Sequence, residues 1–423
     1  MKVMVVGGGG REHAIIKKLK ESKKIVEIYA LPGNGGMTKD ATCVAIGAKD
    51  IDAIVKFAVD NKIDYAVVAP DDPLVLGCVD ALNEVGIPCF GPTKAAAIIE
   101  GSKVFSKNLM KKYGIPTADY EVFTNPVDAL EYLETAPIPT VIKADGLALG
   151  KGVVIAFTKE EAIDAVKSIM EDKKFGDSGN NIVIEEFLTG PEVSVLAFTD
   201  GKVVKPMVSS MDHKRALDND MGLNTGGMGT IAPNPYYTKE IADECMEKIF
   251  IPTINAMNNE GRTFKGCLYF GLMLTPNGPK VIEYNCRFGD PETQVVLPLL
   301  ESDLFEIMQS VTNETLSEQE VKFADKSACC VIMASKGYPE KYENGFEIVI
   351  PDEISNSVYV AGAKMAEGKL LSAGGRVLGV TAIAKDLKSA IDKAYENVKL
   401  IKFDNAFYRN DIGQRALKAT EER

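Results

Sequence analysis

The stretch that decides the fold is VIKADGLALGKGVVIA, residues 141–156. Two short apolar runs, each typical of a strand, enclose a glycine-rich loop that contains Gly150 and Lys151. The loop is not a Walker A motif, because no Ser or Thr follows the lysine and a strand comes next instead of a helix. A glycine loop between antiparallel strands can instead close as a lid over nucleotide phosphates, with Lys143 meeting their charge. The alternative is a glycine-rich hairpin with a surface lysine.

Carboxylates follow at the end of the next apolar strand, in NNIVIEEFLTGPEVSV, residues 180–195. Glu185 and Glu186 end the strand, and Glu192 lies just beyond the turn. A buried carboxylate is costly unless it meets a partner, and an adenine amino group or ribose hydroxyls would be suitable donors. The alternative is a solvated strand end.

A second polar strand lies in GPKVIEYNCRFGDPETQ, residues 278–294. Glu283 and Asn285 are two residues apart, so both side chains point to one face of the strand. Two such oxygen ligands suit Mg²⁺, which keeps phosphate oxygens and water at its other positions. Arg287 falls on the same face, where it is placed to bind a carboxylate or a transferring phosphoryl group. The alternative to a site is a surface turn.

The N-terminal stretch VMVVGGGGREHA, residues 3–14, places a glycine loop between a strand and a helix. Such a loop offers backbone N–H groups at a helix N-terminus, a site for phosphate, and Arg11 would complete it. The dinucleotide fingerprint fails, because its third glycine is replaced by Glu12. A turn without a ligand is the alternative.

The stretch SSMDHKRALDNDMGLNTGGMGTIAP, residues 209–233, has no regular periodicity. It begins with four crowded polar residues, Asp212 to Arg215, and continues with a glycine loop at 225–229 that offers backbone N–H groups. Long irregular loops in compact domains are more often functional than not, and a mobile surface excursion is the alternative.

The fold class that these patterns predict is a mixed α/β and α+β multidomain protein. Strand and helix signals alternate over residues 1–100, which indicates a doubly wound parallel sheet. A helix is expected over Leu74–Val85 and a helical stretch over Lys94–Tyr113. The predicted divisions are 1–100, an α/β domain; 101–190, a first α+β unit with a mobile subdomain at about 117–190; 191–325, a second α+β unit with the metal site; and 326–423, a smaller α+β domain.

Composition narrows the class of protein. The 423 residues carry 48 Lys and Arg against 60 Asp and Glu, so the formal charge of −12 argues against nucleic acid or anionic membrane as partners. We find no signal peptide, no apolar run of about 18 residues and no CxxC pair, and therefore expect a cytoplasmic protein. With only two histidines, a His-rich metal site is excluded.

The order of these motifs resembles the ATP-grasp architecture, in which two α+β units hold ATP between them. More closely, the chain resembles the phosphoribosylamine–glycine ligase family over nearly its full length. The matching segments are GGGGREHA, Leu31–Gly36, FGPTKAAA, EGSKVFSK, VIKADGLALGKGV, VIEEFLTGPEVS, DHKRALDNDMGLNTGGMG, VIEYNCRFGDPETQ, SAGGRVL and FYRNDIGQRA. The resemblance implies the single-function form, a monomer or weak dimer, and the cofactors ATP and Mg²⁺, with Mn²⁺ as an alternative.

The resemblance also implies roles for individual residues. The nucleotide would be held by Lys103, Lys143, Gly150, Lys151, Glu185, Glu186, Leu188 and Glu192. The metal would be held by Glu283 and Asn285, and the catalytic residues would be Arg287, Asp212 and Lys214. Glycine and phosphoribosylamine would be bound by Gly10, Arg11, Glu12, Asp71, Asp212, Asn224, Thr225, Gly226, Gly227, Arg287, Asp290 and Glu292. Replacing Arg287 by Ala is expected to cut turnover with little loss of folding.

The chain departs from the family pattern in three places. The usual Pro-Glu-Ala-Pro-Leu is replaced by residues 70–74, with Asp71 and Asp72 for Glu and Ala; Gly8 replaces an Asn, and Met211 stands where Gln is common. Three alternative functions are an ATP-grasp ligase with other substrates, a nucleotide-binding regulatory protein, and an NAD oxidoreductase. The substrate-side segments GGGGREHA and DHKR…NTGGMG speak against the first of them.

Overall fold

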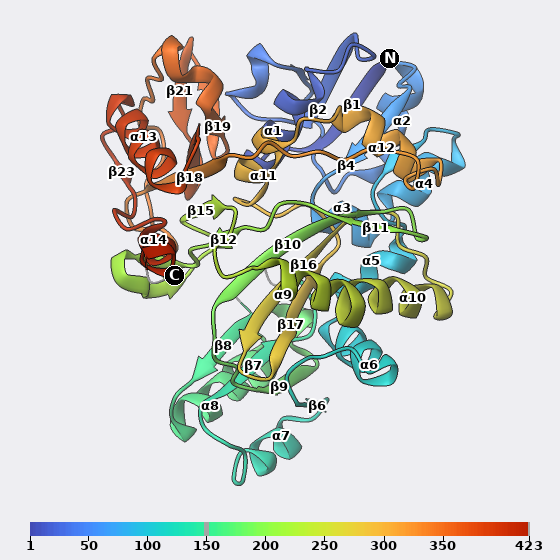
Figure 1. The fold of residues 1–423 in the computed structure, drawn as a ribbon, viewed down its shortest axis with the longest axis vertical. Helices are drawn as coiled ribbons and strands as arrows, with labels where there is room; N and C mark the ends of the chain where they lie inside the picture. Colours follow the sequence, from blue (N-terminus) through green and yellow to red (C-terminus); the bar gives the residue numbers. More distant parts are fainter. Residues whose placement is uncertain (148–151, 422–423) are drawn as a thin grey trace.

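The computed structural model describes residues 1–147 and 152–421 of the chain. Figure 1 shows a blue N-terminal lobe beside an orange and red C-terminal lobe, with the teal and green central segments extending away from both.

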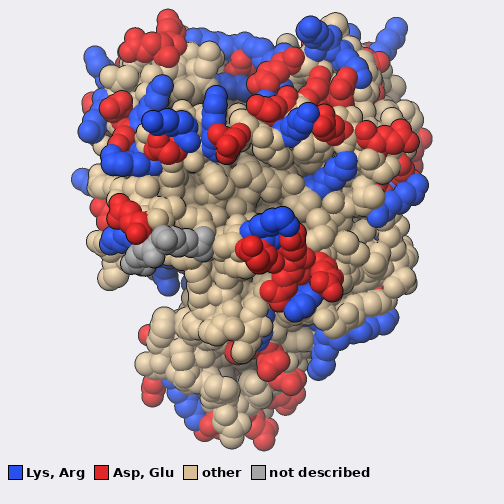
Figure 2. All heavy atoms as spheres, in the orientation of Figure 1, with Lys and Arg blue, Asp and Glu red and all other residues tan. Residues whose placement is uncertain are grey.

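Acidic and basic side chains are intermixed on the face drawn in Figure 2, with a dense group of both signs near its centre. This face therefore presents no extended basic surface in the part of the chain that is drawn with charge colours.

The N-terminal lobe is a parallel sheet with strand order β3-β2-β1-β4-β5, which confirms the doubly wound prediction. Its strands are β1 (Lys2–Gly7), β2 (Glu27–Pro32), β3 (Thr42–Cys43), β4 (Tyr65–Val68) and β5 (Cys89–Phe90). Its helices are α1 (Gly10–Leu19), α2 (Ile51–Asp60), α3 (Asp71–Leu76) and α4 (Cys78–Glu84), with the short η1 (Met37–Lys39). Because all strands run the same way, the loops after β1 and β4 meet at one edge of the sheet.

The helix predicted over 74–85 is interrupted, and the helical stretch predicted over 94–113 consists of two helices. The first begins at Asp71 and is divided at Gly77, whose φ of 94° is left-handed backbone that glycine adopts without strain. The second is divided into α5 (Lys94–Gly101) and α6 (Lys103–Tyr113) by Ser102, which is extended and accepts the Phe105 N–H as an N-cap. The break leaves Glu100 at the end of one helix and Lys103 at the start of the next.

The first α+β unit is an antiparallel sheet with strand order β6-β9-β7-β8. Its strands are β6 (Tyr120–Phe123), β7 (Thr140–Ala144), β8 (Val153–Ala156) and β9 (Ile182–Glu186). The helices α7 (Pro126–Tyr132) and α8 (Lys159–Val166), with η2 (Lys167–Glu171) and η3 (Gly176–Gly179), complete it. A small apolar core between sheet and helices holds this unit together.

The second unit is an antiparallel sheet with strand order β11-β10-β16-β17. Its strands are β10 (Glu192–Thr199), β11 (Val204–Pro206), β16 (Gly266–Thr275) and β17 (Gly278–Asn285). Its helices are α9 (Lys239–Cys245), η5 (Met246–Phe250), α10 (Ile251–Asn259), α11 (Thr293–Leu299) and α12 (Leu304–Thr312). Figure 1 shows α11 beside α1, and residues of α11, α12 and the N-terminal sheet share one apolar core.

The C-terminal lobe is built on a sheet with strand order β12-β15-β18-β22-β19, and β23 pairs with β18. Its strands are β18 (Ser327–Ser335), β19 (Val358–Val360), β22 (Arg376–Ala384) and β23 (Ala406–Phe407), with β12 (Met211–Asp212) and β15 (Gly229–Ala232). Around it lie η6 (Asp352–Ser357), the hairpin β20 (Ala363–Ala366) and β21 (Lys369–Ser372), α13 (Leu387–Leu400) and α14 (Gln414–Glu421). The irregular segment 209–233 is thus bonded to the C-terminal sheet, although sequence reasoning assigned it to the second α+β unit.

No helix among the described residues is both long and apolar enough to span a bilayer. Seven of the eight cysteines are buried as free thiols, and Cys43 is half-buried. This agrees with the interpretation of the cysteines as small core residues.

Candidate active site

A cavity of about 960 Å³ lies where the N-terminal lobe, the two α+β units and the C-terminal lobe meet. The two antiparallel sheets, the loops of the N-terminal sheet and the C-terminal lobe all contribute residues to its wall. Of the predicted site residues, the cavity brings together Arg11, Asp71, Lys103, Lys143, Glu185, Glu186, Leu188, Glu192, Asp212, Lys214, Asn224, Thr225, Gly226, Glu283, Asn285, Arg287, Asp290 and Glu292. Gly150 and Lys151 lie outside the described residues.

One end of the cavity is a buried cluster of lysines around a single carboxylate. The Nζ of Lys143, on β7, lies 2.9 Å from Glu185 Oε2 on the neighbouring strand β9, and Lys107 Nζ lies 3.4 Å from the same oxygen. Lys103 Nζ donates to the carbonyl of Gly146 at 3.0 Å. Two ammonium groups therefore share the buried carboxylate of Glu185, and Lys103 adds a third positive charge to the wall, which leaves this end of the cavity positively charged and suited to a polyphosphate.

Lys107 was missed by sequence reasoning. It lies four residues after Lys103 on α6, so both side chains leave the same face of the helix, and this spacing was the available signal. Lys107 Nζ also donates to Thr117 Oγ1 and the carbonyl of Ala118. Burial lowers the pKa of Lys107 to about 8, although Glu185 acts in the opposite direction.

The rim of this end contains the other predicted nucleotide contacts. Glu186 is exposed and accepts from Lys280 Nζ at 3.2 Å, while Leu188 lies in the segment between β9 and β10 that also lines the cavity. Glu192 Oε2, at the start of β10, lies 3.4 Å from Lys214 Nζ. The carboxylates of Glu185 and Glu192 are thus both engaged by lysines.

Glu283 and Asn285 leave β17 on the face that lines the cavity, as the two-residue spacing predicts. Burial would raise the pKa of Glu283, but Lys214, Lys143 and Lys103 outweigh it and hold that pKa below its ordinary value. Asn285 Oδ1 accepts from Arg287 Nη2 at 3.1 Å. An ionised carboxylate and an amide oxygen on one strand fit Mg²⁺ that takes its remaining ligands from phosphate and water. No group of three or more His, Cys, Asp or Glu suited to a metal occurs among residues 1–147 and 152–421.

Arg287 is the centre of the opposite end. Its Nη2 donates to Glu100 Oε1 at 2.8 Å and lies 3.7 Å from Asp71 Oδ2, while its Nε has no partner. Glu100 was missed by sequence reasoning; its second oxygen accepts the backbone N–H of Cys286 at 2.7 Å. Burial raises the pKa of Glu100, which Arg287 only partly offsets. The Nε–H of Arg287 is buried without a partner among the described residues, while the side chain as a whole lines the cavity.

The C-terminal lobe supplies Arg376, also missed, whose Nη1 donates to the carbonyls of Gly226 and Asp290 at 2.7 and 2.8 Å. Its Nη2 lies 3.5 Å from the carboxylate of Asp290, and Gln294 Nε2 donates to that carboxylate at 2.8 Å. Burial would raise the pKa of Asp290, but Arg376 and Arg11 outweigh it and lower that pKa. Asp290 therefore stays ionised and ties three parts of the chain together.

Asp212 and Lys214 flank His213 and have opposite electrostatic surroundings. Burial, and then the charge of Glu292, raise the pKa of Asp212 well above its ordinary value. Glu192 holds the pKa of Lys214 well above its ordinary value. Gly227 fits against Asp212 only as glycine, because its φ is 112° and an added Cβ would lie 2.5 Å from Asp212 Oδ1.

Three predicted substrate contacts do not line the cavity: Gly10, Glu12 and Gly227. The carboxylate of Glu12 turns back to accept the Gly9 N–H at 2.6 Å and the Arg11 Nε–H at 2.6 Å. Glu12 thus occupies the start of α1 where a phosphate would otherwise bind, and it orients Arg11, whose Nη1 donates to the carbonyl of Phe288 at 3.3 Å. Arg11 is the member of this loop that reaches the cavity.

Two antiparallel α+β units that enclose a lysine-lined cavity, with an acidic strand on each side, define the ATP-grasp class of enzymes. The chain matches the family described as phosphoribosylglycinamide synthetase in all three of its domains: the N domain over residues 1–100, the ATP-grasp (A) domain over 101–293 and the C domain over 328–415. The chain belongs to the phosphoribosylglycinamide synthetase family.

Relatives and solved structures agree with this assignment. The chain is 47% identical to a phosphoribosylamine–glycine ligase of Caldanaerobacter subterraneus, over 97% of this chain and 99% of that protein. It is 46% identical to the trifunctional purine biosynthetic protein adenosine-3 of Bos taurus, over 98% of this chain and 42% of that protein. The crystal structure of phosphoribosylamine–glycine ligase from Thermotoga maritima is similar, with a TM-score of 0.85, 34% identity, and coverage of 97% of this chain and 100% of that one.

The fold extends to more distant enzymes. A biotin carboxylase domain from Hydrogenobacter thermophilus, solved in complex with MgADP, ADP and bicarbonate, has a TM-score of 0.71 at 15% identity, over 96% of this chain and 91% of that one. At this identity the likeness shows the fold alone.

Proposed function

We propose that the chain joins glycine to 5-phospho-D-ribosylamine in purine biosynthesis, with conversion of ATP to ADP and phosphate. Family membership and the names of its relatives support this reaction. The observation that carries the proposal is that one cavity holds both a lysine cluster suited to a polyphosphate and, opposite it, Arg287, Asp212 and Asp290. A protein that only bound nucleotide would not need the second set.

The first step is transfer of the γ-phosphoryl group of ATP to the carboxylate of glycine, which gives glycyl phosphate and ADP. Lys103, Lys107 and Lys143 would hold the phosphates, and Glu185, Glu186, Leu188 and Glu192 would surround the nucleoside. Glu283 and Asn285 would hold Mg²⁺, with Mn²⁺ as an alternative, and the metal would offset the charge of the transferring group. Arg287, whose side chain lines the cavity, would bind the glycine carboxylate.

In the second step, the amine of phosphoribosylamine attacks the activated carbonyl, forms the amide bond and releases phosphate. The amine must lose a proton as the bond forms. Asp212 suits this proton, because a raised pKa makes a carboxylate a stronger base near neutral pH. Asp71 and Arg11, from the N-terminal loops, would bind phosphoribosylamine, and Lys214, Asn224, Thr225, Gly226, Asp290 and Glu292 would complete the wall around both substrates.

The test is ADP release with Mg²⁺, ATP, glycine and phosphoribosylamine generated in the assay, with each component omitted in turn. We expect release to need all of them, and mass spectrometry to find glycinamide ribonucleotide as product. ATP binding without release would reject the substrate pair and leave nucleotide binding standing.

A further inference from the structure

One wall of the cavity is a hairpin that has no other strand partner among the described residues. It consists of β13 (Arg215–Leu217), η4 (Asp218–Asp220) and β14 (Met221–Asn224), and its two strands form a separate two-stranded sheet. Arg215, Asp220 and Asn224 of the hairpin line the cavity. Because isolated two-stranded hairpins are marginally stable in water, this one needs support from elsewhere.

The support comes from the C-terminal arm, which we define as residues 407–415. Arg409 is 2% exposed and forms a bidentate pair with Asp411, with Nε–Oδ1 and Nη2–Oδ2 distances of 2.8 and 2.7 Å. Its Nη1 donates to the carbonyl of Arg215 at 3.0 Å and to Asp220 Oδ1 at 2.9 Å. One buried guanidinium therefore bonds to both the first strand of the hairpin and its turn.

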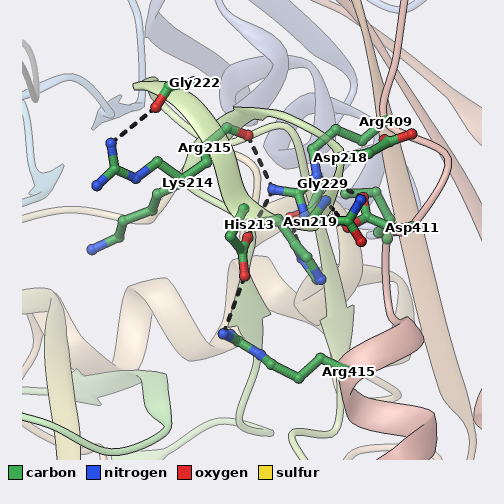
Figure 3. A network of polar contacts seen from close by, with 12 residues as sticks. His213, Lys214, Arg215, Asp218, Asn219, Gly222, Gly229, Arg409, Asp411 and Arg415 are labelled. Carbon is green, nitrogen blue, oxygen red and sulfur yellow. Dashed lines mark hydrogen bonds and ion pairs between the residues drawn. The ribbon is translucent and has the colours of Figure 1, made fainter.

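Further contacts tie the same two segments together, as Figure 3 shows. The Asn219 N–H donates to Asp411 Oδ2 at 2.8 Å, and Asn410 donates to both oxygens of Asp218. Arg415 Nη1 reaches Asp220 Oδ2 at 3.4 Å and also lines the cavity. Every residue of the turn η4 is thus bonded to the arm.

The arm is itself fixed to the core of the C-terminal lobe. Tyr395 Oη, on α13, donates to the carbonyl of Arg409 at 2.6 Å and accepts the N–H of Ile412 at 3.0 Å. His213 Nε2 accepts the N–H of Gly413 at 3.1 Å, and its Nδ1 faces the carbonyl of Gly229. The position of the hairpin, and of the residues on either side of His213, is therefore set by the last part of the chain.

From these contacts we infer that Arg409 is a positioning residue, which holds the hairpin 215–224 and the adjoining Lys214 in place at the substrate end of the cavity. The residue lines no part of the cavity and acts only through the hairpin. Lys214 Nζ lies 3.4 Å from Glu192 and 3.8 Å from Glu283, so a displaced hairpin would separate this lysine from both carboxylates. The lysine cluster around Glu185 has no contact with the arm and would remain intact.

The experiment compares Arg409→Met and Arg409→Lys with the unaltered protein. In Arg409→Met we expect amide hydrogen exchange in peptides covering 213–224 to accelerate by about tenfold or more, with unchanged exchange in β7 and β9. The KM for glycine should rise by about tenfold while the dissociation constant for ATP stays within about twofold. Arg409→Lys should recover part of both effects, because it keeps the charge but loses the bidentate geometry.

The matched control is Lys388→Met on α13, which removes an exposed pair with Asp392 in the same lobe and should change neither quantity. If Arg409→Met does not fold, the same exchange measurement is made on Asp220→Asn. This variant removes the charged partner of Arg409 at the half-exposed turn and leaves Arg409 itself in place. Unchanged exchange over 213–224, or acceleration throughout the C-terminal lobe, would overturn the inference. The inference about KM depends on the proposed function, but the exchange measurement does not, so failure of one can be told from failure of the other.

Discussion

The two ends of the cavity are built in different ways. At the nucleotide end, Lys103, Lys107, Lys143 and Glu185 come from one stretch of fewer than a hundred residues, and two of these lysines, Lys107 and Lys143, share the carboxylate of Glu185. At the substrate end, the N-terminal lobe gives Asp71, the second unit gives Arg287, and the C-terminal lobe gives Arg376. Cations and carboxylates alternate there, and most are paired before any substrate binds.

The difference suggests what each end has to do. A cluster of shared lysines needs only positive charge, because a polyphosphate presents many equivalent oxygens. The substrate end must discriminate between small molecules, and fixed, mutually paired groups give such discrimination since a wrong ligand leaves buried charges without partners. Distortion of the first end should therefore reduce ATP affinity in graded steps, and distortion of the second should mainly reduce turnover.

The largest effect is expected between the two ends, at the proposed metal ligands. Replacing both Glu283 and Asn285 by Ala should bring ADP release to the detection limit, because the metal supplies several kcal/mol of transition-state stabilisation. Steady-state assays over a Mg²⁺ titration would measure this, with the exposed Lys388→Met variant as control. Unaltered Mg²⁺-dependent release would place the metal elsewhere.

Arg287→Ala should come next, with a loss of about 10³-fold in kcat/KM. The sequence alone suggests little loss of folding, but the structure changes this expectation. Arg287 pairs with the buried Glu100, and removal of one partner of a buried pair costs about 3–5 kcal/mol. The double variant Arg287→Met, Glu100→Gln should recover much of the stability in denaturant unfolding without recovering activity; recovery of both would mean that Arg287 is only structural.

The two ends of the cavity also differ in how well their residues could be predicted from the sequence. The pattern Glu283-x-Asn285 placed two side chains on one strand face, and the structure keeps them there because the alternation of a strand is a local property. Glu100, Arg376 and Arg415 carried no local pattern, since only the packing of the lobes brings them to the cavity. Glu12 was expected to help hold phosphoribosylamine, and no pattern in the sequence indicated that its carboxylate bonds to its own loop.

Some of the missed structure did have a signal in the sequence. Gly77 and Ser102 lie inside the two stretches that were expected to be helical, and both residue types commonly mark helix ends. The helical pattern of apolar residues on either side of Gly77 and Ser102 outweighed the preference of these two residues for helix ends in the prediction. The breaks matter for function, because the second one lies between Glu100 and Lys103, and both of these residues line the cavity.

A smaller effect, a gradual loss of ATP affinity with rising pH, is expected at the nucleotide end of the cavity. The pKa of Lys107 is about 8 in the free protein, so the charged form that binds phosphate is lost as the pH rises through that value. ATP affinity should then fall by up to about tenfold per pH unit above pH 8. Lys107→Arg should abolish this dependence, because a guanidinium stays protonated. Calorimetric titration at several pH values would show it; an identical pH dependence in Lys107→Arg would assign the titration to another group.

The smallest effect on catalysis is expected from His213, although it lies between two proposed catalytic residues. Burial lowers its pKa from 6.5 to about 4, so the unfolded chain takes up a proton below pH 6.5 while the folded protein does not. Stability is therefore present above pH 6.5 and is lost as the pH falls toward 4, by no more than about 3 kcal/mol. The ring stays neutral near pH 7, so its Nε2 can accept from Gly413 and hold the C-terminal arm.

His213→Gln should accordingly flatten the decline of the melting temperature between pH 6.5 and 4, and leave the shape of the pH–activity profile above pH 6.5 unchanged. The matched control is the same substitution, His13→Gln, at the other histidine. His13 is also buried with a lowered pKa, and it lies at the interface of the N- and C-terminal lobes. A shift of the activity profile near neutral pH in His213→Gln alone would show that the imidazole takes part in proton transfer. In that case the base of the second step would have to be assigned to His213 instead of Asp212.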